Sequence, residues 1–109
     1  MNTYRETNFG TAIAALADST RRAVLETLEK GPRSVGSIAS ELPVSRPAVS
    51  QHLRVLKEAG LVVDERKGNR RIYRLEPTGL AELHQYVERL WDVALMRFKQ
   101  EAESKEDGR

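Results

Sequence analysis

The chain has 109 residues, with 18 Lys and Arg, 16 Asp and Glu, two His and no Cys. This length suits a single domain, and the lack of Cys excludes disulfides, iron–sulfur clusters, thiolate metal sites and cysteine nucleophiles. No apolar run approaches the roughly 20 residues of a membrane-spanning helix, and Met1 to Gly10 lacks the apolar block of a signal peptide. We therefore expect a cytoplasmic protein that does not enter a membrane.

The charges are distributed unevenly along the chain. Residues 1–44 hold five basic and five acidic side chains, residues 45–75 hold eight and three, and residues 76–109 hold five and eight. The middle segment therefore has a net charge of +5, between a neutral and an acidic neighbour. This segregation indicates a surface that binds a polyanion, and a basic surface that serves only solubility is the alternative.

Two helices are predicted before residue 31. A short apolar stripe indicates a first helix over about 9–17. Oxygens of Asp18-Ser19-Thr20 can cap a second helix, which Gly31-Pro32 would end. The apolar residues behind these two predictions are Ile13, Leu16 and Ala17 in the first helix and Val24, Leu25 and Leu28 in the second.

Two further helices follow, each with a cap and a stop. Ser34 can cap a short third helix, which Pro43-Val44 would break. Ser45 can cap a fourth helix over about 45–59, where Pro47 is tolerated because first-turn amides have no helical partner. The predicted inner faces are Val35, Ile38, Ala39 and Leu42 in the third helix and Val49, Leu53 and Leu56 in the fourth.

After Gly60 the pattern changes to that of strands. Two runs of β-branched and aromatic residues surround Lys67-Gly68-Asn69-Arg70, where Gly and Asn suit a backbone with positive φ. We therefore predict a two-stranded hairpin over about 61–75. A long helix is predicted over about 78–101, and the charged residues 102–109 are predicted to form a flexible tail.

The third and fourth helices are separated only by residues 42–44, which is typical of a helix-turn-helix. If the fourth helix buries its apolar stripe, its opposite face is free to enter the major groove of DNA. Arg can bond to guanine and Gln to adenine there. An ordinary amphipathic helix with a polar outside is the alternative. The residues of this helix predicted to contact DNA are Ser45, Arg46, Pro47, Ser50, Gln51, His52 and Arg54, with His52 bonding to phosphate or backbone.

A basic hairpin directly after such a helix is the arrangement of a winged helix-turn-helix. Its tip would lie along phosphates or enter the minor groove, with predicted contacts from Arg66, Lys67, Arg70 and Arg71. The predicted fold class is therefore mainly α with a small β-hairpin, in the order α-α-α-α-β-β-α. We expect one such domain over 1–101, and we expect its partner to be double-stranded DNA.

Four short motifs lie between Leu16 and Leu75. They are Ala17-Asp18-Ser19-Thr20-Arg21-Arg22, Ser50-x-His52-Leu53-x-x-Leu56, Ala59-Gly60-Leu61-Val62 and Arg71-Ile72-Tyr73-Arg74-Leu75. With these motifs the segment resembles the ArsR family of winged-helix transcriptional repressors. The resemblance implies a homodimeric cytoplasmic repressor that binds a palindromic operator.

Metal sensing occurs in many members of that family, but this sequence departs from their pattern. The positions that match the family's two metal-binding cysteines are Ser34 and Gly36, and neither supplies a thiolate. Glu82-x-His84 resembles half of the family's other metal site, but the second half falls on Leu95 and Phe98. We therefore predict no metal and no cofactor. A metal-responsive repressor with an unrecognised site is the alternative.

The sequence shows no catalytic arrangement. It has no glycine-rich phosphate loop, no dinucleotide-binding motif and no carboxylate pair spaced for acid–base chemistry. We therefore predict a DNA-binding regulator and not an enzyme. A winged helix used only for protein–protein contacts is a further alternative, although the charge segregation argues against it.

The last predicted helix has an apolar band too broad for one small domain to cover. Exposed patches of this extent are avoided unless they form an interface, and a two-fold partner would bury the same stripe against its own copy. We therefore expect a homodimer whose two recognition helices lie about 34 Å apart. The predicted interface is Leu83, Val87, Leu90, Trp91, Ala94, Leu95 and Phe98, and the alternative for Trp91 is a place in the core of its own chain.

Overall fold

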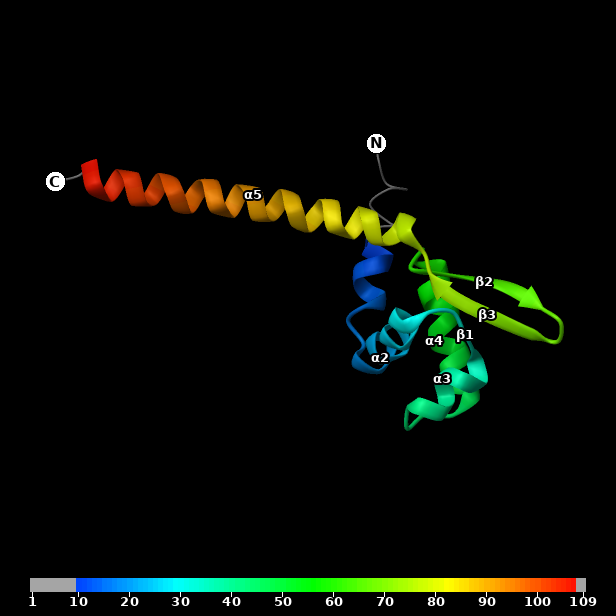
Figure 1. Cartoon of the computed structure of the whole chain (residues 1–109). Coiled ribbons are helices and arrows are strands. Elements are labelled where there is room, and N and C mark those ends of the chain that lie inside the picture. The colour runs from blue at the N-terminus through cyan, green and yellow to red at the C-terminus, as the bar shows by residue number, and fades with distance from the viewer. Residues whose placement is uncertain (1–9, 108–109) are drawn as a thin grey trace.

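The computed structural model describes residues 10–107. Its helices and hairpin follow the predicted order (Figure 1). The bounds are residues 10–15 for the first helical segment, α2 Ser19–Thr27, the 3₁₀ helix η1 Leu28–Lys30, β1 Arg33–Ser34, α3 Val35–Glu41, α4 Arg46–Glu58, β2 Val62–Lys67, β3 Arg70–Leu75 and α5 Pro77–Asp107. The predicted fold class is confirmed, because the chain is a mainly helical winged helix-turn-helix with a long C-terminal helix.

Three predicted features differ from the structure. The first helical segment ends at residue 15 and not 17, and its predicted start at residue 9 lies outside the described residues. The sheet has three strands and not two, because β1 adds to the hairpin. α5 continues to Asp107, so residues 102–107 are helical and not a flexible tail. Residues 108–109 of that predicted tail lie outside the described part of the chain.

Side-chain caps that the sequence predicted stand at the start of α2, α3 and α4. Asp18 Oδ1 accepts a hydrogen bond of 2.9 Å from the backbone N–H of Arg21. The hydroxyl groups of Ser34 and Ser45 each accept one of 3.2 Å from the backbone N–H three residues later. These bonds satisfy amides that have no partner within the helix. The capping side chain therefore determines the residue at which each of these helices begins.

The sheet is antiparallel with the order β1-β3-β2. β1 pairs with residues 72–73 in the middle of β3, which connects the hairpin to the start of α3. The sequence did not reveal β1, because two residues are too few to show strand periodicity. The hairpin turn has a positive φ at Gly68 (64°) but not at Asn69, so the expectation for Asn69 was wrong.

α4 supplies the centre of the core. Its predicted stripe of Val49, Leu53 and Leu56 is fully buried. Side chains from α2, α3 and the start of the hairpin join this stripe in one apolar cluster, because each element has an apolar face that must be covered. The other buried members of the cluster are Ala15, Val24, Leu28, Ile38, Leu61 and Val62.

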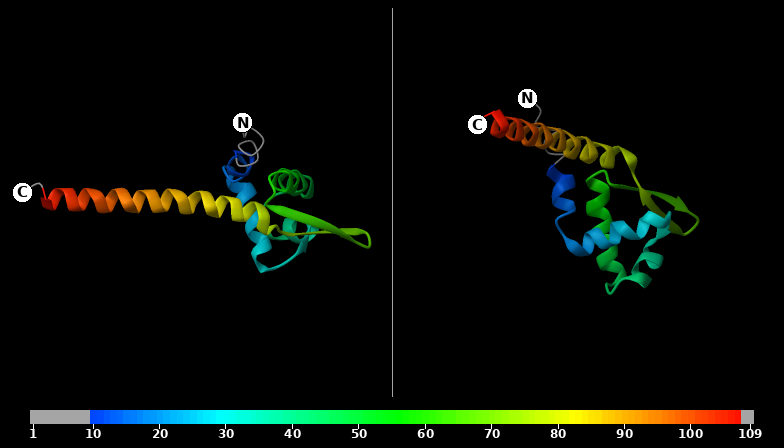
Figure 2. Two further views of the ribbon diagram at one scale, coloured as in Figure 1. Left: turned by 90° about the horizontal axis from the view of Figure 1, so that it is seen from above. Right: turned by 60° about the vertical axis from the view of Figure 1, so that its left-hand side comes forward.

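α5 leaves the compact part of the molecule and extends into solvent (Figure 2). Leu80 and Leu83 still pack against the core, but every position from 87 to 105 is exposed. The radius of gyration is 19.0 Å, against about 13 Å for a compact chain of this size. Trp91 is 62% exposed, so it does not lie in the core of its own chain.

The far end of α5 is charged and still helical. Residues 101–107 are mostly Glu, Ala and Lys, which favour helix without any tertiary contact. This propensity explains why the predicted tail is an extension of the helix. No helix within residues 10–107 combines the length and the apolar content that crossing a membrane would require.

The start of α5 touches the end of α4 through two glycines. Gly60 follows α4 with a φ of 77°. A Cβ on Gly79, in the first turn of α5, would lie 2.0 Å from the Gly60 carbonyl oxygen and 2.6 Å from its carbon. Because these are backbone atoms, only glycine at position 79 permits this approach.

Replacing Gly79 with Ala should therefore destabilise the fold by about 1–3 kcal/mol, as overpacking a closed contact does. Urea unfolding at a fixed protein concentration measures the change. Gly10→Ala is the matched control and should not destabilise, because nothing lies within 4 Å of a Cβ there. A Gly79→Ala protein as stable as the wild type would show that α4 and α5 separate easily.

Candidate nucleic-acid interface

The outward face of α4 is polar and open to solvent. Arg46, Pro47, Ser50, Gln51 and Arg54 are all exposed, as burial of the opposite stripe predicted. Arg54 Nη2 donates a hydrogen bond of 3.1 Å to Gln51 Oε1. Two side chains that suit guanine and adenine therefore hold each other on the same face of the helix.

Ser45 and His52, also predicted to contact DNA, have other surroundings. The Ser45 hydroxyl caps α4 through the Ala48 amide. His52 is half-buried, and its Nδ1 is buried with no hydrogen-bond partner among residues 10–107. It lies near Asp18, whose pKa is lowered mainly by the Arg21 backbone N–H and to a smaller extent by the charges of Arg21 and His52. One ring nitrogen of His52 is therefore buried and not open to solvent.

The tip of the hairpin, which we call the wing, carries cations around its turn. Lys67 and Arg70 are cross-strand partners on either side of the turn, and both are exposed. Arg66 Nε donates a hydrogen bond of 3.3 Å to the carbonyl oxygen of Gly68. Within residues 10–107 none of these three has a carboxylate partner, so their charges are available to an external anion.

Arg71 differs from these cations because a buried carboxylate holds it. The side chain of Asp64 is 4% exposed, and its carboxylate oxygens lie 2.8 Å from Lys57 Nζ and 2.7 Å from Arg71 Nη1. Since Lys57 lies on α4 and Arg71 on β3, Asp64 links the helix to the wing. Hydrogen bonds from Lys57, and to a smaller extent from Arg71, hold the pKa of Asp64 below its usual value, although burial opposes them.

Sequence reasoning missed Asp64, although strand periodicity carried a signal. Side chains alternate between the two faces of a strand, so Val62 and Asp64 share a face, and Val62 is buried. An acidic side chain on that face within a basic segment predicts an internal ion pair. Arg71 was assigned to DNA, and its contact with phosphate remains a prediction alongside its bond to Asp64.

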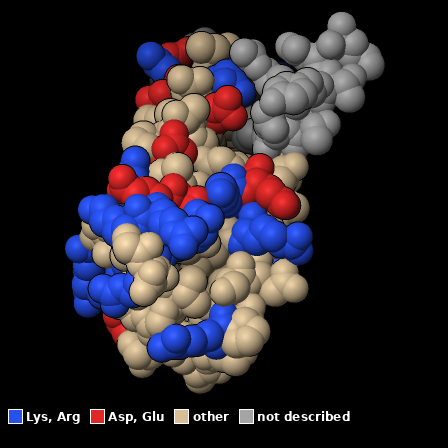
Figure 3. All heavy atoms as spheres, turned by 90° about the vertical axis from the view of Figure 1, so that its right-hand side faces the viewer, with Lys and Arg blue, Asp and Glu red and all other residues tan. Residues whose placement is uncertain are grey.

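These pairings divide the basic segment into two groups. Lys57 and Arg71 bond to Asp64, and Arg74 lies 3.8 Å from Glu65. The remaining cations have no carboxylate partner within the described residues. Figure 3 shows Lys and Arg gathered on the face that carries the wing tip, with few acidic side chains among them. The unpaired members are Arg46, Arg54, Arg66, Lys67 and Arg70.

Metal ligands do not gather in the part of the chain that the structure describes. Within residues 10–107, no three His, Cys, Asp or Glu side chains are placed to hold a metal ion. His84, which resembled part of a metal motif, is exposed on α5. The absence of a metal in the working protein remains a prediction.

Comparison with known proteins agrees with this geometry. Residues 18–63 match the family model described as "Bacterial regulatory protein, arsR family". Over 107 residues the chain is 53% identical to the HTH-type transcriptional regulator Rv2034 of Mycobacterium tuberculosis, covering 98% of each protein. The chain belongs to the ArsR family. This ArsR protein is therefore a DNA-binding transcriptional regulator and not an enzyme, and the resemblance carried by its motifs is confirmed.

Two further proteins are similar to this ArsR protein. The transcriptional repressor SdpR of Bacillus subtilis is 40% identical over 68 residues, which cover 62% of this chain and 76% of SdpR. The homodimeric winged helix-turn-helix DNA-binding domain Mb0332 of Mycobacterium bovis, a possible ArsR-family regulator, aligns with a TM-score of 0.68 and 30% identity. That alignment covers 84% of this chain and 85% of the other.

Asp64→Asn should destabilise the domain by about 1–2 kcal/mol, because a hydrogen-bonded carboxylate is lost while its half-exposed cations return to water. Because the folded pKa is lowered, the contribution of Asp64 is complete above the usual value of 3.8 and is lost as pH falls through the folded pKa. The stability difference between wild type and variant should therefore shrink below about pH 4. Urea unfolding at neutral and acidic pH measures it.

Glu65→Gln is the matched control for Asp64→Asn. Glu65 is 56% exposed and lies 3.8 Å from Arg74, so its loss should change stability by less than about 0.5 kcal/mol. If the two variants behaved alike at every pH, Asp64 would not link α4 to the wing.

Gln51→Ala and Arg54→Ala should each relax sequence preference, costing about 1–3 kcal/mol on a preferred duplex. Because the two side chains bond to each other, the double variant should lose less than the sum of the single losses. Fluorescence anisotropy with preferred and scrambled duplexes measures both quantities. Lys30→Ala, which removes an exposed cation outside this face, is the control. Wild-type discrimination in both single variants would mean that α4 reads bases through other residues.

Proposed function

We propose that this regulator is a homodimeric repressor that binds a palindromic operator in the cytoplasm. The observation that carries the proposal is the uncovered apolar face of α5. The exposed fractions of its large apolar side chains lie between 48% and 73%, far above those of core residues. These side chains are Val87, Leu90, Trp91, Val93, Leu95, Met96 and Phe98.

The spacing of this face suits a second copy of the same helix. Leu83, Val87, Leu90 and Ala94 recur at intervals of three or four residues, so they form one stripe. Trp91, the largest of the neighbouring apolar residues, widens the stripe on one side. A two-fold axis would bury it against its own copy. The homodimeric state of the similar domain Mb0332 supports this arrangement.

Two-fold symmetry would also determine the form of the operator. Two copies of α4 related by such an axis would enter successive major grooves about 34 Å apart, and their site would be a palindrome. Arg71 would contribute less than the other contacts because Asp64 already binds it. The proposed contacts are Ser45, Arg46, Pro47, Ser50, Gln51, His52, Arg54, Arg66, Lys67, Arg70 and Arg71.

Repression follows from occupancy of such a site. A dimer bound across a promoter excludes the transcription machinery from the same DNA, without any catalytic step. The similar protein SdpR is a transcriptional repressor, which supports repression over activation for this regulator. Selecting bound fragments from random duplex DNA tests the proposal, and we expect enrichment of an inverted repeat with half-sites one helical turn apart. Enrichment of a single half-site without symmetry would contradict it.

Leu90→Glu and Leu95→Glu should each convert the dimer to a folded monomer that loses operator binding, since a charge on the buried stripe has no partner. Sedimentation measures the oligomeric state, and circular dichroism shows whether the fold persists. Fluorescence anisotropy measures the affinity for the operator. Gln85→Glu adds the same charge at an exposed polar position of α5 and should leave the dimer intact. A wild type that sediments as a monomer at micromolar concentration would overturn the proposed dimer.

A further inference from the structure

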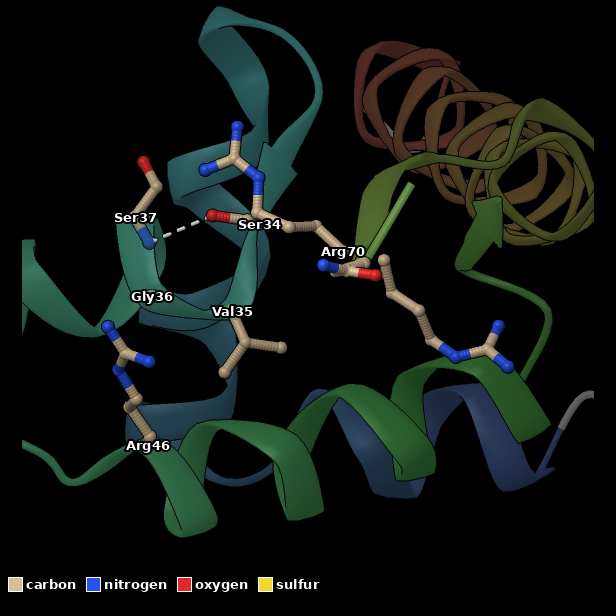
Figure 4. A pocket seen from close by; sticks show the side chains of 8 residues that line it. Ser34, Val35, Gly36, Ser37, Arg46 and Arg70 are labelled. Carbon is tan, nitrogen blue, oxygen red and sulfur yellow. Dashed lines mark hydrogen bonds between the residues drawn. The ribbon is translucent and has the colours of Figure 1, made fainter. Parts of the chain in front are cut away.

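A concavity of about 440 Å³ lies between the helix-turn-helix and the wing (Figure 4). The first turn of α3 forms one wall, the start of α4 another, and the wing tip the third. No acidic residue lines it, and three arginines do. Its polar lining includes Ser34, Ser37, Arg46, Asn69 and Arg70.

Arg46 and Arg70 enter this concavity from different elements. Figure 4 shows both side chains extending toward the segment Ser34–Ser37, one from α4 and one from the wing. Neither guanidinium group has a hydrogen bond or an ion pair with any residue that the structure describes, in contrast to that of Arg71. Two guanidinium groups without an internal anionic partner therefore line one concavity, and an anion bound there would be attracted to both of them.

Gly36 makes room for Arg46. A Cβ at position 36 would lie 2.8 Å from Arg46 Nη2 and 3.1 Å from its Cζ. The guanidinium therefore lies close to the backbone of α3, and a side chain at this position would require the flexible end of Arg46 to shift. Arg46 is also the first residue of α4, a position where helices favour anions, and no acidic residue compensates it in that turn.

The two serines complete the donor set. The Ser34 hydroxyl accepts a hydrogen bond from the Ser37 amide, and the Ser37 hydroxyl accepts one from Arg33. Each oxygen is thus already an acceptor within the protein, which leaves each hydroxyl hydrogen free to be donated. The concavity therefore presents donors and positive charge, which is the chemistry that a phosphate group requires.

We propose that this concavity binds one phosphate group, held between Arg46 and Arg70 with Ser34 and Ser37 as further donors. The assignment of its source rests on the proposed operator binding, because α4 and the wing flank the concavity and a backbone phosphate of the operator fits between them. Free inorganic phosphate offers the same chemistry and is the second source to be tested. A backbone phosphate here would connect the start of the recognition helix to the tip of the wing.

A duplex with one neutral methylphosphonate, moved one position at a time, tests the site. At one position in each half-site, the wild type should lose affinity about tenfold, the value of a charged hydrogen bond. Arg46→Gln with Arg70→Gln should be weaker on every duplex but insensitive at that position. Arg66→Gln removes a wing cation that does not line the concavity, so it should keep the wild-type sensitivity.

Gly36→Ala tests whether Arg46 acts by binding phosphate or only by stabilising the fold. Alanine favours the helix, so α3 should be at least as stable. The end of Arg46 must move away from the new Cβ, so the loss of affinity at the sensitive position should become smaller. Unchanged sensitivity in Gly36→Ala and in the double arginine variant would overturn the backbone-phosphate assignment.

Inorganic phosphate distinguishes the two sources. Added to the free protein, it should shift the NMR amide signals of Gly36 and Asn69 in the wild type but not in the arginine variant. Such shifts without a sensitive DNA position would identify a free anion as the ligand, and the absence of both effects would overturn the site. Shifts in a protein that binds no duplex would refute the proposed operator binding while supporting the phosphate site.

Discussion

α4 must be buried along one side and exposed along the other, and the remaining elements are arranged around this requirement. Leu53 lies at the centre of the core, and Gln51 and Arg54, its near neighbours in sequence, lie in solvent. Successive residues of a helix point about 100° apart, so a rotation by one residue would bury a guanidinium. The apolar contacts of α2, α3 and the sheet prevent this rotation. The same contacts that stabilise the fold therefore orient the exposed side chains that we propose to contact DNA.

The electrostatics of the surface depend on which cations the protein itself neutralises. Asp64 forms ion pairs with Lys57 and Arg71 and so neutralises part of their charge, and Glu65 lies near Arg74. The unpaired cations that remain lie on α4 and at the wing tip. The distribution of charge along the chain indicated a surface that binds a polyanion, but only the ion pairs of the structure show which cations are free to contact one.

Features that depend on neighbouring residues could be predicted from the sequence. The caps at Asp18, Ser34 and Ser45 and the buried stripe of α4 all follow from local pattern. The strand β1 could not be predicted, because its two residues form a strand only through pairing with β3. The end of α5 was misjudged because apolar content was weighed above helix propensity. The family resemblance, carried by short motifs, was confirmed by full-length similarity.

The candidate site was predicted in its parts and not in its assembly. Arg46 and Arg70 were each assigned to DNA from their own surroundings in the sequence. Both line the same concavity at the start of α3. Because β1 pairs with β3, the start of α3 lies beside the wing, and no local pattern shows such a contact. The ion pairs of Asp64 likewise join α4 to both strands of the hairpin. Tertiary contacts among distant segments were therefore the part that sequence reasoning did not reach.

The contact between Gly60 and Gly79 sets the angle at which α5 leaves the rest of the domain. Because α5 is long, a small change of this angle moves its far end by a large distance. The helix has 31 residues, so its length is about 46 Å. A rotation of about 5° at this pivot would carry the far end of such a helix through about 4 Å. If two copies are joined along α5, that helix is held in place and the rotation moves the compact part of each copy instead. The distance between the two α4 helices then changes. Whatever alters the packing of these two glycines would then tune which half-site spacing the dimer accepts.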